Sequence, residues 1–376
     1  MADQPLPPPV PPNDLILSID DLKEAGSKKL PFATREFFNS GATAQTTLSE
    51  NTTAFSKYRL RPRVLRDVSA IDTTTTVFGQ RIAFPLCIAP AGTQALAHPS
   101  GELATARACA KRRVHMGVSS MANHGLGAIR AAGTAVWPAA AHAVQLYTMV
   151  DRAREEAVVR AAEAAGCAAA LLTADSPVLG ARHNERRNAF RVPDGAAFPI
   201  VGLGAGVIDG ARFAATNSDA HSWAEVAWLR GVTRMEVWVK GVLTPEDVVL
   251  AREHGCDGVI VSNHGGRQLD GAPATVDVLA ACVEAAEGKI RVHVDSGIRS
   301  GADIFKALAL GAECCWVGRP VLWGLAYDGE AGVDKMLDIL YEDFKRCMQL
   351  TGCTSVSDIS KDCLGIFRSD GPLARL

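Results

Sequence analysis

The sequence is poor in aromatic side chains and has almost no net charge. Phe, Trp and Tyr make up 6% of the 376 residues, and 39 basic side chains against 41 acidic ones give a formal charge of −2. A nucleic-acid binder or a polybasic membrane protein would carry a clear basic excess, so neither class is indicated. Hydrophobic residues at 48% and charged residues at 21% fit an ordinary globular protein and argue against a mainly disordered one.

Several local signals are also missing. No pair among the ten cysteines has CxxC spacing, and no Cys/His cluster has zinc-finger spacing. No run approaches the roughly 18 apolar residues of a membrane-spanning helix. The proline-rich start, residues 1–12, lacks the apolar core of a secretory signal. We therefore expect reduced intracellular thiols, with Cys314 and Cys315 buried in an apolar run.

From residue 82 onward, short apolar strands alternate with alanine-rich helices. The predicted strands are 82–89, 114–119, part of 135–147, 169–175, 235–240, 258–263, 290–295 and 314–318. The helices between them include 101–111, 152–165, 245–253, 275–286 and 301–310. Eight such units predict an α/β fold, a parallel (β/α)8 TIM barrel. A doubly wound open sheet is the alternative, but no GxGxxG follows the first strand.

The other segments are expected to lie around one barrel domain, residues 18–370. Residues 1–17 predict a flexible arm, and residues 371–376 a tail. A short helical segment should precede the barrel, because Ser18–Asp21 resembles a helix cap and Gly41 ends a second helix. The stretch from Gly180 to about His221, after strand four, is long enough to be a lid loop.

Polar side chains and glycines follow the predicted strands, and a barrel gathers all eight strand ends on one face. His264 comes directly after the 258–263 strand and is a candidate base. Arg267 could clamp a carboxylate with two hydrogen bonds. Asp175 ends another strand, and it would orient His264 and stabilise its protonated form.

Further rim residues suggest a bound phosphorylated cofactor. Lys240 could stabilise negative charge on a reduced cofactor or an enolate, or form a Schiff base as in barrel aldolases. The segments 295–299 and 318–319 follow strands seven and eight, where barrels commonly bind phosphate through backbone N–H groups and arginine. A base, a carboxylate clamp, a lysine and a phosphate site together predict a phosphorylated cofactor and a small acid as substrate.

One motif resembles a known family. The run Ser262-Asn263-His264-Gly265-Gly266-Arg267-Gln268-Leu269-Asp270 resembles the signature of FMN-dependent α-hydroxy acid oxidases and dehydrogenases, which include glycolate, lactate and mandelate enzymes. Ordered matches extend from about residue 18 to about residue 360. Among them are Gln145-Leu146-Tyr147, Thr173-Ala174-Asp175-Ser176-Pro177 and Val239-Lys240-Gly241-Val242.

The resemblance implies FMN as the cofactor and a role for each matching residue. His264 would take the substrate hydroxyl proton as hydride passes to the flavin, or act in a carbanion route that begins with Cα deprotonation. Asp175 would pair with His264, Tyr147 would hydrogen-bond near the substrate oxygen, and Lys240 would stabilise the reduced flavin. The substrate carboxylate would meet Arg182 and Arg267. The FMN-binding residues would be Pro90, Ala91, Gly92, Ser119, Gln145, Thr173, Lys240, Ser262, Asp295, Gly297, Arg299, Gly318 and Arg319.

Three positions depart from the glycolate oxidase pattern. We place Arg35 where those enzymes carry a tyrosine, so Arg35 is either a solvent-facing side chain or a second cation in the substrate pocket. Met121 stands where they often have tryptophan, and Gly92 where several have alanine. We therefore predict a roomier substrate pocket and a substrate larger than glycolate, such as an aryl, longer-chain or polar 2-hydroxy acid.

The expected activity is oxidation of an (S)-2-hydroxy acid, with O2 as acceptor and hydrogen peroxide as product. The alternatives are a dehydrogenase with another acceptor, a non-catalytic flavin-binding protein and a class I aldolase. We expect no nucleic-acid or membrane partner, and the resemblance implies a homotetramer. The tripeptide Ala374-Arg375-Leu376 is a variant of the peroxisomal address, which predicts a peroxisomal location, or otherwise a cytoplasmic one.

Overall fold

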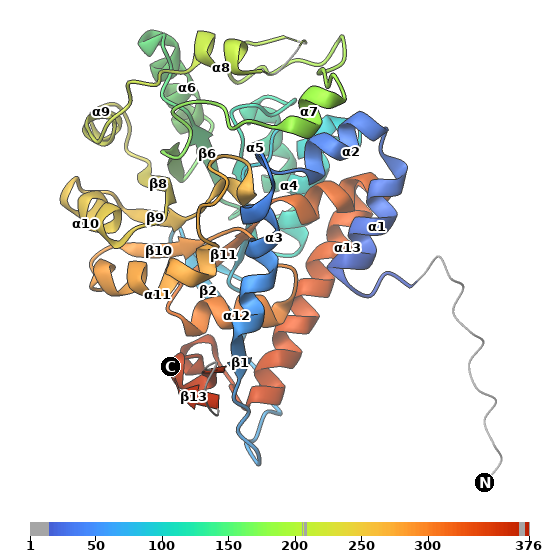
Figure 1. Cartoon of the computed structure of the whole chain (residues 1–376), viewed down its shortest axis with the longest axis vertical. Helices are drawn as coiled ribbons and strands as arrows, with labels where there is room; N and C mark the ends of the chain where they lie inside the picture. The colour runs from blue at the N-terminus through green and yellow to red at the C-terminus, as the bar shows by residue number, and fades with distance from the viewer. Residues whose placement is uncertain (1–14, 205, 207–208, 368–372, 376) are drawn as a thin grey trace, which may run out of the picture.

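The computed structural model describes residues 15–204, 206, 209–367 and 373–375. Within these residues, eight parallel strands close into a barrel in the order β10-β11-β4-β5-β6-β7-β8-β9 (Figure 1). The strands are β4 (Leu86–Ile88), β5 (His115–Val118), β6 (His142–Leu146), β7 (Ala169–Thr173), β8 (Glu236–Val242), β9 (Gly258–Val261), β10 (Arg291–Val294) and β11 (Cys314–Val317). The predicted (β/α)8 barrel is confirmed.

A helix follows each barrel strand. These helices are α4 (Gly101–Lys111), α5 (Leu126–Thr134), α6 (Arg152–Ala164), α9 (Ala224–Val232), α10 (Pro245–Glu253), α11 (Thr275–Ala286), α12 (Gly301–Ala309) and α13 (Arg319–Thr351). The five helices predicted from the sequence lie within one residue of α4, α6, α10, α11 and α12. Local signals explain this agreement: Thr244 and Ser300 cap α10 and α12, and Pro245 opens α10.

The predicted strand 82–89 is two strands, not one. Strand β3 (Gln80–Ile82) pairs antiparallel with β2 (Thr75–Val77), and β4 begins only at Leu86. Pro85 stands between them, and proline has no N–H to donate to a ladder. At the β2–β3 turn, the Phe78 ring lies edge-on to Trp238 and Trp316, with centroids 5.8 and 6.2 Å apart. The hairpin therefore fills one end of the barrel with apolar side chains.

Three helices precede the barrel: α1 (Ile19–Lys29), α2 (Phe32–Asn39) and α3 (Thr46–Thr53). The predicted cap is confirmed as a capping box between Ser18 and Asp21. Helix α1 lies against α13 (Figure 1). In α3, Asn51 exchanges hydrogen bonds of 2.9 and 2.6 Å with Asn263, so this segment is fastened to the barrel just after β9.

The long stretch after β7 carries two short helices, α7 (His183–Arg187) and α8 (Gly210–Thr216), which lie along the top of Figure 1. Most of the predicted N-terminal arm, up to residue 14, lies outside the described residues, as do residues 371, 372 and 376 of the predicted tail. No helix in the described part of the chain has the length and apolar character needed to cross a membrane. All ten cysteines lie within the described residues and are free thiols.

Candidate functional site

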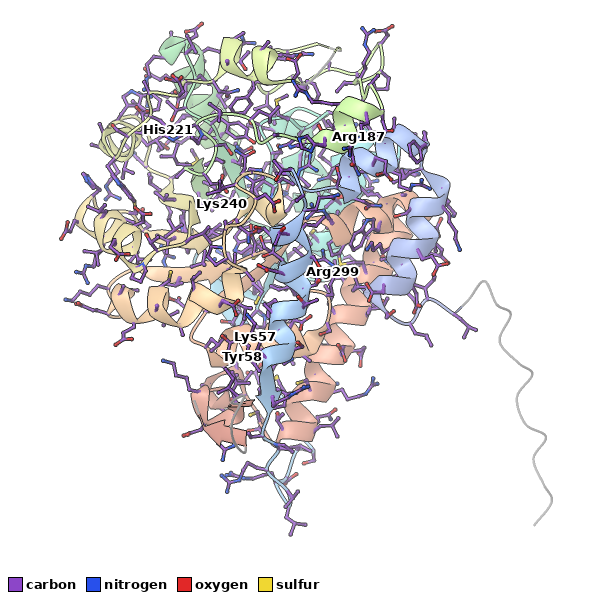
Figure 2. All side chains as sticks on the ribbon, in the orientation of Figure 1. Lys57, Tyr58, Arg187, His221, Lys240 and Arg299 are labelled. Carbon is purple, nitrogen blue, oxygen red and sulfur yellow. The ribbon has the colours of Figure 1, made fainter. Side chains whose placement is uncertain are left out.

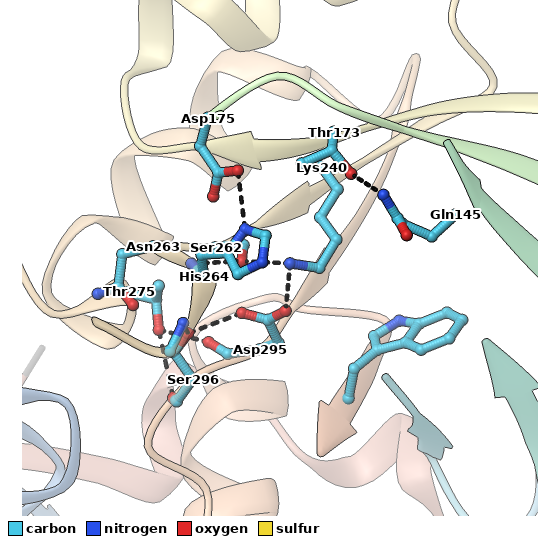
Figure 3. A network of polar contacts seen from close by, with 12 residues as sticks. Gln145, Thr173, Asp175, Lys240, Ser262, Asn263, His264, Thr275, Asp295 and Ser296 are labelled. Atoms are coloured by element: carbon cyan, nitrogen blue, oxygen red, sulfur yellow. Dashed lines mark hydrogen bonds and ion pairs between the residues drawn. The ribbon is translucent and has the colours of Figure 1, made fainter. Parts of the chain in front are cut away.

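A cavity opens at the carboxyl ends of the barrel strands, the face where barrel enzymes carry their active sites. Its lining contains most of the residues predicted from the sequence: Pro90, Ala91, Gly92, Ser119, Met121, Gln145, Tyr147, Thr173, Arg182, Lys240, His264, Arg267, Asp295, Gly297, Arg299, Gly318 and Arg319. Asp175 and Ser262 lie just behind this lining, where they bond to His264 and Lys240 (Figure 3). Arg35 is the one predicted residue that the structure places elsewhere.

His264 and Asp175 form a hydrogen-bonded pair at the centre of this site. The Nδ1 atom of His264 lies 3.0 Å from Oδ1 of Asp175, which leaves Nε2 as the free ring nitrogen. Burial lowers the pKa of His264, although Asp175 opposes this effect, so the ring is neutral near pH 7. Burial works against ionisation of Asp175, but His264 and Lys240 outweigh it and keep its pKa below the usual range. The pair therefore presents a neutral, oriented imidazole that can accept a proton.

The backbone at this point is strained. His264 has a φ of 57°, and Ser296 on the next strand end has a φ of 74°. Non-glycine residues seldom adopt this left-handed conformation, and such strain gathers at functional sites. The Ser262 hydroxyl accepts from the His264 backbone N–H at 3.1 Å, and the Ser296 hydroxyl accepts from Gly265 N at 3.0 Å. These bonds hold the turn that aims His264 into the cavity.

Lys240 is a buried, paired cation. Its Nζ lies 3.0 Å from Oδ2 of Asp295 and donates to Ser262 Oγ at 2.8 Å (Figure 3). Burial opposes its charge, but Asp295 and Asp175 more than compensate and raise its pKa. Figure 2 shows Lys240 in the middle of the molecule. Because Schiff-base formation needs the free amine, the ion pair with Asp295, which favours the charged form of Lys240, argues against the class I aldolase alternative.

Two arginines that could bind a carboxylate share one buried counter-ion. Oε1 of Glu185 lies 3.5 Å from Arg182 Nη1 and 3.2 Å from Arg267 Nη2. Arg267 also donates to the Phe37 carbonyl at 2.7 Å, which fixes its position. Burial and the charge of Arg182 lower the pKa of Arg267 to about 10, so it remains charged at neutral pH. Arg182, Arg267 and His264 line the same cavity, so a ligand carboxylate bound by the arginines would lie near the imidazole.

The ends of β10 and β11 fit a phosphate group. Burial lowers the pKa of Arg299 to about 10, and burial together with Arg267, Arg299 and Arg182 lowers the pKa of Arg319. Arg299 donates to the Ile298 carbonyl, and Arg319 donates to backbone carbonyls of the α2 end and the His264 turn. Within the described residues, none of these hydrogen bonds goes to a carboxylate, so a bound dianion would supply the missing negative charge.

Backbone and amide groups complete a cradle for a flat ring. Gly318 starts α13, and a Cβ built on it would have no heavy atom nearer than Ala89 Cβ at 4.0 Å, so this backbone is open to the cavity. The Gln145 amide donates to Thr173 Oγ1 at 2.9 Å (Figure 3). It also accepts a hydrogen bond from Ser120 N at 3.1 Å. These groups fit the FMN that the sequence resemblance implies. When bound, FMN supplies the two-electron chemistry that no side chain here provides.

Two of the pocket predictions need correction. Arg35 lies outside the cavity: its Nε is 3.5 Å from Glu36 Oε1, and its guanidinium stacks on the Phe32 ring at 4.8 Å. Gly92 leaves no extra room, because a Cβ there would come within 3.0 Å of the Met121 Cβ. Met121 itself does line the cavity, as predicted.

Sequence reasoning missed several residues of the site. Phe37 and Phe38, not Arg35, are the cavity-lining residues of α2. Glu185 went unnoticed because its role depends on Arg267, which is 82 positions away in the chain. An acidic residue in an arginine-rich stretch offered a weak signal, since buried arginines need counter-ions.

Comparison with known proteins adds independent evidence. A family model described as FMN-dependent dehydrogenase matches residues 26–366. Oxidase FUB9 of Fusarium oxysporum f. sp. lycopersici is 44% identical over 368 residues, covering 95% of this chain and 93% of that protein. Peroxisomal (S)-2-hydroxyacid oxidase GLO3 of Arabidopsis thaliana is 43% identical over 357 residues, covering 93% and 96%. The crystal structure of mandelate oxidase superposes with a TM-score of 0.84 at 36% identity, covering 96% of this chain and 99% of that chain.

Proposed function

Because the chain belongs to the FMN-dependent dehydrogenase family, and is thus an oxidoreductase acting on the CH–OH group of 2-hydroxy acids, we propose that it is an (S)-2-hydroxy acid oxidase that reduces O2 to hydrogen peroxide. The observation that carries this proposal is the hydrogen-bonded His264–Asp175 pair beside two arginines, Arg182 and Arg267. An acid–base group next to an anion clamp suits a substrate with a hydroxyl beside a carboxylate.

In this proposal, each side chain acts on the substrate in a defined way. Arg182 and Arg267 bind the substrate carboxylate and fix the position of Cα. The free Nε2 of His264 accepts a proton from the substrate, and Asp175 stabilises the imidazolium that results. Tyr147, whose pKa burial raises, stays protonated and donates a hydrogen bond to the substrate oxygen. Lys240 would supply a positive charge that stabilises the reduced form of bound FMN.

We also propose that the substrate is larger than glycolate. The α2 side of the cavity is apolar, since Phe37 and Phe38 line it and Arg35 does not. Met121 adds a flexible apolar wall on another side. An aryl or longer-chain acid matches these surfaces, and the structural relative named above acts on mandelate, according to its name.

The test is to identify the acceptor that takes the electrons from the reduced flavin. Purified FMN-loaded protein is supplied with (S)-2-hydroxy acids in air, and oxygen uptake and peroxide are followed together. The proposal predicts one peroxide for each 2-oxo acid formed. Absence of peroxide, with rapid turnover once an artificial dye is added, would instead establish the dehydrogenase alternative. Absence of 2-oxo acid formation with either acceptor would support the non-catalytic flavin-binding protein.

Two further features belong to the same proposal. We propose a homotetramer, to be checked by light scattering. We propose a peroxisomal location through Ala374-Arg375-Leu376, of which Leu376 lies outside the described residues. Support comes from the relative whose name describes it as peroxisomal. A fluorescent fusion that ends in this tripeptide should enter peroxisomes, and the same fusion without it should stay in the cytosol.

A further inference from the structure

The same cavity is also lined by residues of the β6–α6 loop, of α6 and of the long segment after β7, and we call this part of the cavity the distal lobe. It is lined by Met149, Glu155, Val158, Val201, Leu203, Arg212, Phe213, Thr216 and Asn217. The Phe213 ring stands edge-on to Tyr147, with centroids 5.4 Å apart. Tyr147 lines the cavity together with Arg182 and His264. Tyr147 therefore borders both parts of the cavity.

The walls of the distal lobe are fixed parts of the fold. One wall is the β6–α6 loop with the first turns of α6, and the other is the end of the long segment after β7. Val150 N donates to the Thr216 carbonyl at 3.1 Å, and Ser218 N donates to the Thr148 carbonyl at 2.9 Å. These backbone bonds join the β6–α6 loop to the end of α8. The lobe is thus a built chamber with a mostly apolar surface.

Among the described residues that line this lobe, Glu155 is the one with a carboxylate, and one of its two carboxylate oxygens lacks a hydrogen-bond partner. Its side chain is 1% exposed. Oε2 accepts from Met149 N at 2.9 Å and lies 3.1 Å from Arg152 Nη1. Oε1 is buried and has no hydrogen-bond partner among the residues that the structure describes. Burial also raises the pKa of Glu155 to about 7. A buried acceptor left unpaired is costly, so this oxygen calls for a donor from a ligand.

The missing donor is best supplied by a neutral group. Arg152 already contacts Glu155 and is held by Glu225 through bonds of 2.6 and 2.9 Å. Arg212 lines the same lobe. A ligand cation would therefore meet the Arg152 guanidinium beside Glu155, whereas a neutral hydroxyl can pair with Oε1 of Glu155 without that repulsion.

Resting on the proposed oxidase function, we propose that the distal lobe receives the side chain of the substrate and that Glu155 accepts a hydrogen bond from a hydroxyl at its far end. The substrate class is then an (S)-2-hydroxy acid with an extended apolar chain that ends in a hydroxyl. The carboxylate end lies at Arg182 and Arg267, the apolar chain passes Tyr147 and Phe213, and the terminal hydroxyl reaches Glu155.

The test uses carboxylic acids that lack the 2-hydroxyl and so bind without reacting. Unbranched acids and their terminally hydroxylated counterparts, matched in overall length, are titrated into FMN-loaded protein, and the change in flavin absorption gives Kd. Affinity should rise by up to about fourfold per added methylene until the lobe is filled. At the matching length, the hydroxylated acid should bind at least roughly tenfold more tightly than the methyl-terminated one.

Glu155→Met keeps the apolar volume and removes the acceptor, so it should reverse this preference. Glu155→Gln keeps the shape and should reduce the preference, which covers the case in which the methionine variant fails to fold. The matched control is Glu156→Gln: this neighbour is 43% exposed and pairs with Arg160 on the helix surface, so the preference should match that of the unmodified chain.

Two results would overturn the inference. If the unmodified chain and both Glu155 variants show the same preference for the hydroxylated acid, Glu155 serves only to hold the β6–α6 loop in place. Affinity that does not change with chain length would show that ligands do not enter the lobe. The proposed oxidase function fails differently, when no (S)-2-hydroxy acid of any length reduces the flavin, and these Kd values do not depend on that result.

Discussion

Replacing Asp175 with Asn isolates the role of the charge next to His264. The Asp175–His264 bond of 3.0 Å joins a buried carboxylate to Nδ1, and Oδ2 of Asp175 has no partner among the described residues. Asn keeps the size but cannot stabilise the imidazolium that forms when Nε2 takes the substrate proton. General acid–base catalysis contributes roughly 10²–10⁴-fold. We therefore expect the rate of flavin reduction to fall within that range, which corresponds to about 3–5 kcal/mol of activation free energy.

The assay is anaerobic mixing of FMN-loaded variant with substrate, followed in the visible flavin band, with flavin content as a check on folding. Ser176→Ala is the matched control, because Ser176 Oγ donates a neutral hydrogen bond to the same Oδ1 at 3.1 Å. Loss of that bond should cost less than about tenfold. Near-normal flavin reduction by Asp175→Asn, or an equal loss in Ser176→Ala, would refute the reasoning.

The remaining predictions concern Arg267, Lys240 and the dependence of stability on pH. Arg267→Lys should raise KM by tenfold or more while changing kcat less, because lysine cannot replace the planar guanidinium; steady-state kinetics with one acid checks this. Lys240→Met should lower the free energy of unfolding by about 3–5 kcal/mol, measured in urea, since it leaves Asp295 buried without its 3.0 Å partner. Burial lowers the pKa of His115 to about 4 and those of His142 and His293 to about 3. As the pH falls below 6.5, the unfolded chain therefore protonates these three histidines before the folded chain does. Glu155, with its pKa raised to about 7, has the opposite effect, because the folded chain binds its proton first and so offsets one of the three histidines. The free energy of unfolding should therefore fall by about 3 kcal/mol for each pH unit between pH 6 and 4. A flat profile in urea titrations would contradict these burial effects.

The sequence predicted the barrel well because its signals are local. Short apolar runs set the strands, and capping residues such as Ser300 set helix starts. The strand ends then had to meet on one face, which brought His264, Lys240 and Arg319 together although they are far apart in the chain.

What the sequence could not predict depends on rotation about a helix axis and on long-range packing. The face of α2 that meets the cavity carries Phe37 and Phe38, and a helix of eight residues offered too little periodicity to separate this face from that of Arg35. Glu185 and Glu155 were not predicted as site residues, because only the folded chain buries them beside arginines. The space beside Gly92 was misjudged since it depends on where Met121 packs.

The central claim is that this site takes two electrons from a 2-hydroxy acid. The most direct measurement is the absorption of the FMN-loaded protein in the absence of oxygen, while a panel of 2-hydroxy acids is added in both enantiomers. The account predicts that (S)-acids larger than glycolate bleach the flavin, with 2-oxo acid formed in equal amount, and that (R)-acids do not. An FMN-loaded protein that keeps its flavin colour with every acid would contradict it.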